Sequence, residues 1–172
     1  ERGLAQQSRG AHEAAISDFS SAIASNPNDA EVFRARARSF SHLQKLAESV
    51  NDLSAAIQLE PQNNELFLAR GDAYLAFVTP EEALKDFDDV LTRDAVNPVV
   101  YRGRGAALLA LGDADAAMKE FTKAIRLDAH HADAYECRGD AALHKQDYER
   151  AIADFTKFLS LEPDSDRKAS VY

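Results

Sequence analysis

The stretch AYECRGDAALHKQDYERAIADFTKFLSLEP, residues Ala134–Pro163, carries the pattern that decides the fold. It holds two apolar segments in which large and small residues recur at helical spacing, and a short polar stretch separates them. It ends in a proline, which cannot continue a helix. The same pattern recurs upstream every 34 residues. Self-similarity at this period predicts a stack of helix pairs that share an elongated core.

Four copies of the pattern align without gaps, and a partial copy precedes them. In the full copies the fourth position is aromatic, the eighth is Gly or Ala, the twentieth is Ala or Ser, and the twenty-fourth is Phe or Leu. Small residues let two helices approach closely, and aromatic rings fill the space between pairs. We expect one continuous domain with these parts: a partial repeat at 1–29, repeats at 30–63, 64–97, 98–131 and 132–165, and a polar tail at 166–172.

This ladder resembles the tetratricopeptide repeat family over nearly the whole chain. The resemblance implies an all-α fold, a right-handed superhelical solenoid of antiparallel helix pairs whose first helices line a concave groove. The copy that contains Ala37 and Leu53 departs most from the family pattern, and we expect its helices to pack less tightly. Caps and turn residues then place the helices. They are predicted at 12–25, 30–43, 47–59, 65–77, 80–93, 98–110, 114–127, 132–145 and 148–161, after the end of another helix before Ser8.

A charge pair repeats with the scaffold. The seventh position is Arg in every copy, and the twenty-third, sixteen residues later, is always acidic. In an antiparallel hairpin these positions lie at the same height, so we predict a ladder of bidentate ion pairs with a structural role. An alternative is that these Arg residues bind an anionic ligand. The predicted pairs are Arg2–Asp18, Arg36–Asp52, Arg70–Asp86, Arg104–Glu120 and Arg138–Asp154.

The resemblance also implies which side chains face a partner. In the family, positions 2, 5, 6, 9, 12 and 13 of the first helices point into the groove. They predict a basic end, an apolar middle that includes Gly103, and an acidic end that includes Asp133. A groove with this asymmetry could orient an extended or helical segment. The candidate groove residues are Arg34, Arg38, His42, Leu68, Asp72, Leu75, Arg102, Ala106, Leu109, Glu136, Asp140 and His144.

A familiar co-chaperone variant does not fit this chain. Family members that hold the C-terminal carboxylate of a chaperone carry Lys and Asn residues at set groove positions. Ala69 and Gly103 stand where an Asn would be needed, and Val99 where a Lys would be. The two-carboxylate clamp is therefore not expected, although an acidic motif could be held differently by Arg34, Arg38 and Arg102. An adaptor role in the cytoplasm, similar to that of a co-chaperone, remains an expectation.

The last predicted helix carries several large apolar residues, with only a short polar tail after it. Terminal repeats usually end in a polar capping helix, so we expect this edge to need cover from a further helix, a partner or a second copy. A homo-oligomer would form through Tyr148, Phe155, Phe158 and Leu159. The chain also begins inside a predicted first helix, so we expect it to be a section of a longer protein.

No motif of catalysis or cofactor binding emerges from the sequence. A cluster at Asp128, His130, His131 and Asp133 could bind a metal but is more typical of plain surface, and Cys137 lacks a His to activate it. We therefore expect no enzyme activity, no cofactor and no metal. The net charge of −9 disfavours nucleic acid, and no apolar stretch has the length of a membrane span.

The predicted function is that of a non-catalytic scaffold that binds a peptide, a helix or a protein subunit in its groove. Two alternatives stay open. One is a domain that recruits substrates for an enzyme carried elsewhere in a longer protein. The other is a self-association module that uses the apolar edge of the last helix.

Overall fold

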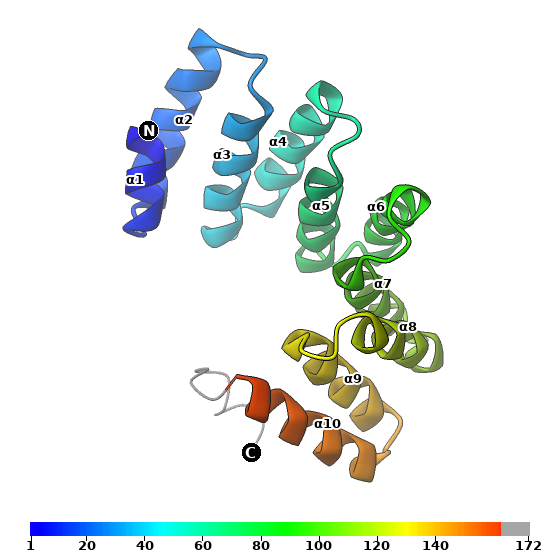
Figure 1. Cartoon of the computed structure of the whole chain (residues 1–172). Coiled ribbons are helices and arrows are strands. Elements are labelled where there is room, and N and C mark those ends of the chain that lie inside the picture. Colours follow the sequence, from blue (N-terminus) through cyan, green and yellow to red (C-terminus); the bar gives the residue numbers. More distant parts are fainter. Residues whose placement is uncertain (163–172) are drawn as a thin grey trace. The chain divides into compact units, whose positions relative to one another are not determined.

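A computed structural model describes residues 1–162 of the chain. Within these residues every regular element is an α-helix, and consecutive helices form antiparallel pairs (Figure 1). The helices are α1 (Arg2–Ser8), α2 (His12–Ser25), α3 (Ala30–His42), α4 (Leu46–Leu59), α5 (Asn64–Ala76), α6 (Pro80–Arg93), α7 (Pro98–Ala110), α8 (Ala114–Leu127), α9 (Ala132–His144) and α10 (Tyr148–Leu161). The predicted all-α class is confirmed, and every predicted helix end lies within one residue of the observed end.

The chain divides into two compact units. The first unit comprises Glu1–Asp86, and the second begins at Phe87, so that the division falls inside α6. Within the first unit each helix packs on the next along the chain from α1 to α5, and in the second unit α7 also contacts α9. The predicted tail at 166–172 lies outside the described residues.

The turn inside each helix pair always contains one residue with left-handed backbone geometry. Gly10 and Gly112 adopt it at φ values of 75° and 86°, as expected for the residue without a Cβ. In the other repeats this place is taken by Gln44, Val78 and Gln146 at φ values of 58° to 60°. Val78 is β-branched, for which this region is strained. The repeat therefore imposes one turn geometry even where the local sequence disfavours it.

Close approach between the two helices of a pair depends on matched residues. A Cβ added to Gly105 would lie 2.4 Å from the Phe121 ring, and Gly3 and Gly139 face Phe rings in the same way. In the repeat at 30–63 the pair is instead Ala37 and Leu53, and both side chains are buried. Where Ala replaces Gly on the first helix, Leu replaces Phe on the second, so the total volume of the pair changes little. The expected looser packing of this repeat is not what the structure shows at this contact.

The ion pairs predicted from the repeat are all present. Arg36, Arg70 and Arg138 each donate two hydrogen bonds of 2.7–2.9 Å to the carboxylate sixteen residues later in the chain. The three Asp partners are buried, and the Arg side chains are 18–19% exposed. The hydrogen bond with Asp154 raises the pKa of Arg138, and Asp52 acts likewise on Arg36. Arg2 also donates to Asp18, but its side chain is 80% exposed.

In the four full repeats the Arg of this ladder also contacts the preceding repeat. Arg36 donates to Ser20 at 2.9 Å, Arg70 to Ser54 at 3.0 Å, and Arg138 to Thr122 at 3.1 Å. The remaining pair of the full repeats, Arg104–Glu120, differs from the other three. Arg104 contacts Glu120 with one nitrogen at 2.9 Å and pairs with Asp88 of the preceding repeat at 2.8 Å. The guanidinium groups therefore join consecutive repeats as well as the two helices of one repeat.

Aromatic rings flank these guanidinium groups. The Arg36 guanidinium lies 5.9 Å from the Phe33 ring centroid and 5.7 Å from that of Phe40. Arg70 lies between Phe67 and Tyr74 at the same spacing of three and four residues along the helix. Such contacts hold a cation over the ring face. They restrict the rotamer of each Arg and so support the bidentate geometry.

Candidate partner-binding site

Arg38 of the first unit lies between three hollows. Three hollows, with volumes of about 360, 440 and 520 Å³, surround α3, and Arg38 lines all of them. Its side chain is exposed, and no ion pair to it is found within residues 1–162. We name these three hollows together the α3 site. It combines one available cation with adjacent apolar surface, which is the combination that fixes and orients a ligand.

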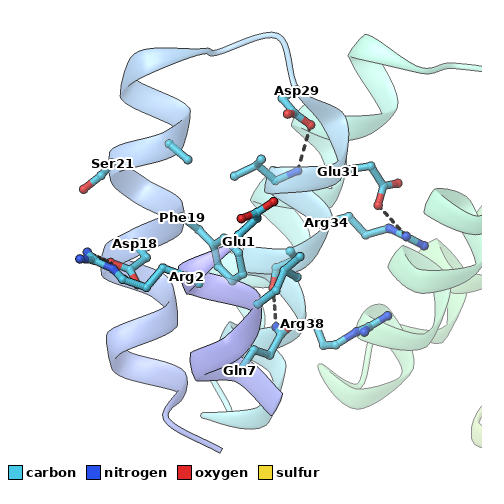
Figure 2. A pocket seen from close by; sticks show the side chains of 15 residues that line it. Glu1, Arg2, Gln7, Asp18, Phe19, Ser21, Asp29, Glu31, Arg34 and Arg38 are labelled. Atoms are coloured by element: carbon cyan, nitrogen blue, oxygen red, sulfur yellow. Dashed lines mark hydrogen bonds and ion pairs between the residues drawn. The ribbon is translucent and has the colours of Figure 1, made fainter. Parts of the chain in front are cut away.

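The first hollow lies between α1, α2 and α3 (Figure 2). Its apolar lining includes Leu4, Phe19 and Ala35, and Gln7 crosses it to donate to the Ala35 carbonyl at 2.7 Å. Asp29 caps the N-terminus of α3, where its side chain accepts a hydrogen bond from the Val32 backbone N–H. Apolar surface and charged rim are therefore both present within one hollow.

The other two hollows share Arg38 and His42, which lie one helical turn apart on α3. Leu53 and Ala69 supply apolar surface to the second hollow. His42 stacks on His12 of α2, with ring centroids 4.4 Å apart and an angle of 12° between the rings. This stack fixes the His42 ring beside Arg38.

Arg34 differs from the sequence-based expectation of a basic groove end. Its guanidinium pairs with Glu31 at 2.7 Å and with Glu65 of α5 at 2.6 Å. The hydrogen bond with Glu31 raises the pKa of Arg34. Two carboxylates thus compensate this charge, and its role becomes one of joining α3 to α5. Of the three residues predicted to form the basic end of the groove, Arg38 and the neighbouring His42 therefore remain.

The remaining candidate groove residues fall in both units. In the first unit Leu68 and Leu75 of α5 are half-buried and Asp72 is exposed. In the second unit Arg102, Ala106 and Leu109 of α7 and Glu136 of α9 are half-buried, while Asp140 and His144 are exposed. Although Asp140 is exposed as a residue, partial desolvation of its carboxyl raises the pKa, and the charge of His144 opposes this shift. A groove that unites all of them stays a prediction.

Two expected surface residues are in fact part of the core. Gly103, placed in the apolar middle of the groove, is buried, and a Cβ added to it would lie 2.6 Å from the Phe87 ring. Phe158, placed on the apolar edge of α10, is fully buried. Phe155 and Leu159 are half-buried, whereas Tyr148 is exposed together with Ile152. The part of α10 that could meet a second copy is therefore smaller than the sequence suggested.

The chemistry of Cys137 is that of a packed thiol. Burial raises its pKa to about 12, so it is protonated at neutral pH. Within residues 1–162 no group of three or more metal-ligating side chains is found. None of the described helices has the length and apolar composition needed to span a membrane.

Sequence comparison establishes the family. The tetratricopeptide repeat model matches residues 34–98 and 102–166, which together make up most of the chain. The chain therefore belongs to the tetratricopeptide repeat family, as its helix pairs indicate. A comparison with curated proteins finds no match.

Solved structures of low sequence identity share the fold. A tetratricopeptide repeat protein from Parabacteroides merdae has a TM-score of 0.87 at 22% identity, with 99% of this chain and 65% of that chain covered. A protein from Thermus thermophilus, TTC0263, gives 0.82 at 21% identity, covering 98% and 94%. YrrB, described as having an unusual peptide-binding site, gives 0.69 at 20% identity, covering 94% and 84%. At these identities the likeness concerns the fold.

Some features of the site escaped the sequence reasoning. The contacts of the ladder with the preceding repeat were missed, although a signal exists. Ser20, Ser54, Asp88 and Thr122 are all hydrogen-bonding residues, and each lies sixteen positions before an Arg of the ladder. The neutralisation of Arg34 was missed because Glu65 is distant in sequence, and only the packing of α5 on α3 and α4 brings it close. The His12–His42 stack likewise had no sequence signal.

Proposed function

We propose that this chain is a non-catalytic interaction module, and that the α3 site binds a peptide or helical segment of a partner protein. The partner segment carries a carboxylate next to apolar side chains. Arg38 binds the carboxylate, and the apolar side chains occupy the hollows on either side of α3. The observation that carries the proposal is the position of Arg38, an uncompensated cation that lines three adjoining hollows.

Charge-assisted recognition suits this arrangement. An Arg can donate two parallel hydrogen bonds to a carboxylate, which fixes direction as well as position. Apolar lining from Leu4, Phe19 and Leu53 then adds affinity through burial. Membership of a repeat family whose helix pairs commonly present such surfaces supports a protein partner, and the protonated thiol of Cys137 gives no support to a nucleophile.

Selection from a random peptide library, followed by calorimetry on the enriched peptides, tests the proposal. We expect enriched peptides to combine Asp, Glu or a terminal carboxylate with large apolar residues. Arg38→Glu should weaken their binding about tenfold or more, because it replaces attraction by repulsion at the anchor. Arg9→Glu makes the same charge change in the first unit on an exposed residue outside the three hollows. Equal loss in both variants, or none in either, would exclude the α3 site.

A further inference from the structure

A second charged hollow lies in the other unit of the chain, away from the groove positions. It has a volume of about 340 Å³ and gathers side chains from two helices, α8 and α10, and from the turn that follows α9. Four are cations and one is a carboxylate, in a chain whose net charge is −9. We name this the basic hollow, and its lining residues are Asp115, Met118, Lys119, Thr122, Arg126, Lys145 and Arg150.

The repeat geometry explains why these cations converge. Lys119, Thr122 and Arg126 follow one another at spacings of three and four, and so lie on one face of α8. Lys145 caps the C-terminal end of α9, and Arg150 belongs to the first turn of α10. The turn after α9 and the first turn of α10 thus each bring one cation to the face of α8 that carries the other two.

Most donors of the basic hollow are available to a ligand. Lys145 pairs with Asp115, but an ammonium group has three donors. The Arg150–Asp147 contact is 3.8 Å long, beyond hydrogen-bond distance. No ion pair to Lys119 or Arg126 is found within residues 1–162. The cations also affect Asp115. The hydrogen bond from Lys145 and the charges of Lys145 and Lys119 lower the pKa of its carboxyl.

Thr122 adds a neutral donor to the floor of this hollow. Its hydroxyl oxygen accepts from Arg138 at 3.1 Å, which is one of the contacts that join consecutive repeats. With the oxygen engaged in this way, the hydroxyl hydrogen can be donated to a ligand. A carboxylate bound here would therefore have one neutral donor from Thr122 between the cations of Lys119 and Arg126.

We infer that the basic hollow docks an acidic segment of a partner protein, independently of the α3 site. Charge complementarity carries the inference, because four cations and one carboxylate face a single small hollow. A short segment with two or three carboxylates needs only this local field. A nucleic acid carries continuous charge along its backbone and would also meet the acidic surface that gives the chain its net charge of −9. The same holds for an anionic membrane surface.

The test uses a fluorescein-labelled hexa-glutamate peptide and anisotropy at about 50 mM salt, where charge interactions are weakly screened. We expect saturable binding that weakens as salt is raised. Lys119→Glu/Arg126→Glu should lower the affinity about tenfold or more. Lys85→Glu/Lys157→Glu makes the same change in net charge at exposed residues outside the hollow. This control should bind the peptide within about twofold of the unaltered chain.

Single-stranded DNA and vesicles that contain phosphatidylserine serve as the competing ligands. Tighter binding of either one than of the peptide, with loss in Lys119→Glu/Arg126→Glu, would overturn the assignment to an acidic protein segment. Absence of peptide binding to the unaltered chain, or equal loss in the control, would overturn the site itself. Arg38→Glu should leave hexa-glutamate binding unchanged, which separates this result from the test of the α3 site.

Discussion

At the scale of single residues, the guanidinium groups of Arg36, Arg70 and Arg138 are each held by three hydrogen bonds. Arg138 donates to Asp154 twice and to Thr122 once, and its guanidinium lies 5.7 Å from the Tyr135 ring centroid. Asp154 is buried, so Arg138 supplies hydrogen bonds that water cannot readily provide at this place. The geometry supports the structural interpretation of the ladder over the anion-binding one, since the donors that would hold a ligand are already engaged.

A double-mutant cycle on Arg138 and Asp154 measures this interaction. We expect Arg138→Ala alone to cost about 3 kcal/mol in urea unfolding, because it leaves a buried carboxylate without its partner. The double variant Arg138→Ala/Asp154→Ala should cost less than the sum of the single variants by about 2 kcal/mol. Costs that simply add would show that the two side chains act independently and that the pair has no structural role.

At the scale of the helix, five starts among the described residues are capped by one side chain. Asp29, Asn63 and Asn97 accept a backbone N–H near the start of the following helix. The two Asn residues also donate to an acidic side chain three positions earlier, Glu60 and Asp94. The equivalent residue before α9 is His131, which makes no side-chain cap. Its Nε2 is buried without a hydrogen-bond partner among the described residues.

We therefore predict that His131→Asn stabilises the chain by about 1 kcal/mol. The new side chain can accept a backbone N–H of α9 and donate to Asp128, as Asn97 does with Asp94. Thermal unfolding at neutral pH measures the gain. His131→Ala is the matched control, because it removes the imidazole and supplies no cap. Equal stability of the two variants would mean that the cap contributes nothing at this position.

The same substitution should change the acid sensitivity. Burial lowers the pKa of His131 below its usual 6.5. As the pH falls, His131 therefore binds a proton more readily in the unfolded chain than in the folded one. Its contribution to the free energy of unfolding is fully present above about pH 6.5 and decreases as the pH drops below that value. Both His131→Asn and His131→Ala remove this contribution. Unfolding curves at several pH values between neutral and mildly acidic should show a smaller loss for either variant than for the unaltered chain.

The helix ends were predictable to within one residue because the residues that mark each boundary recur in several copies of the repeat. Asn97, Asp113 and Asp147 belong to the residue types that favour helix N-caps, and each accepts a backbone N–H at the start of its helix. The surface was less predictable, since exposure depends on neighbours from other helices. The sequence predicts Arg34 as a groove cation, but in the structure it pairs with Glu65. The sequence also predicts Phe158 at an apolar edge, but in the structure its side chain is buried. Side-chain periodicity predicts a face but not what covers that face.

At the scale of the whole molecule, stability should be a sum of local terms. The strongest helix contacts join neighbours along the chain, apart from the contact between α7 and α9. The ladder follows the same pattern, because Arg70 and Arg138 each donate to a carboxylate of their own repeat and to a hydroxyl of the repeat before it. In such an array a local defect destabilises its own repeat and the adjacent ones, and distant repeats keep their stability.

Gly105→Ala tests this rule. The added Cβ would lie 2.4 Å from the Phe121 ring, so we expect a loss of about 2 kcal/mol at the α7–α8 contact. Native-state hydrogen exchange should then be about tenfold to thirtyfold faster in α7, α8 and the adjoining α9, and unchanged in α1 to α3. Gly105→Ala/Phe121→Leu recreates the Ala37–Leu53 pair and should recover part of the protection. Faster exchange in every helix alike would instead mean that the chain unfolds as one cooperative body, in which case the local logic of the repeats would not govern its stability.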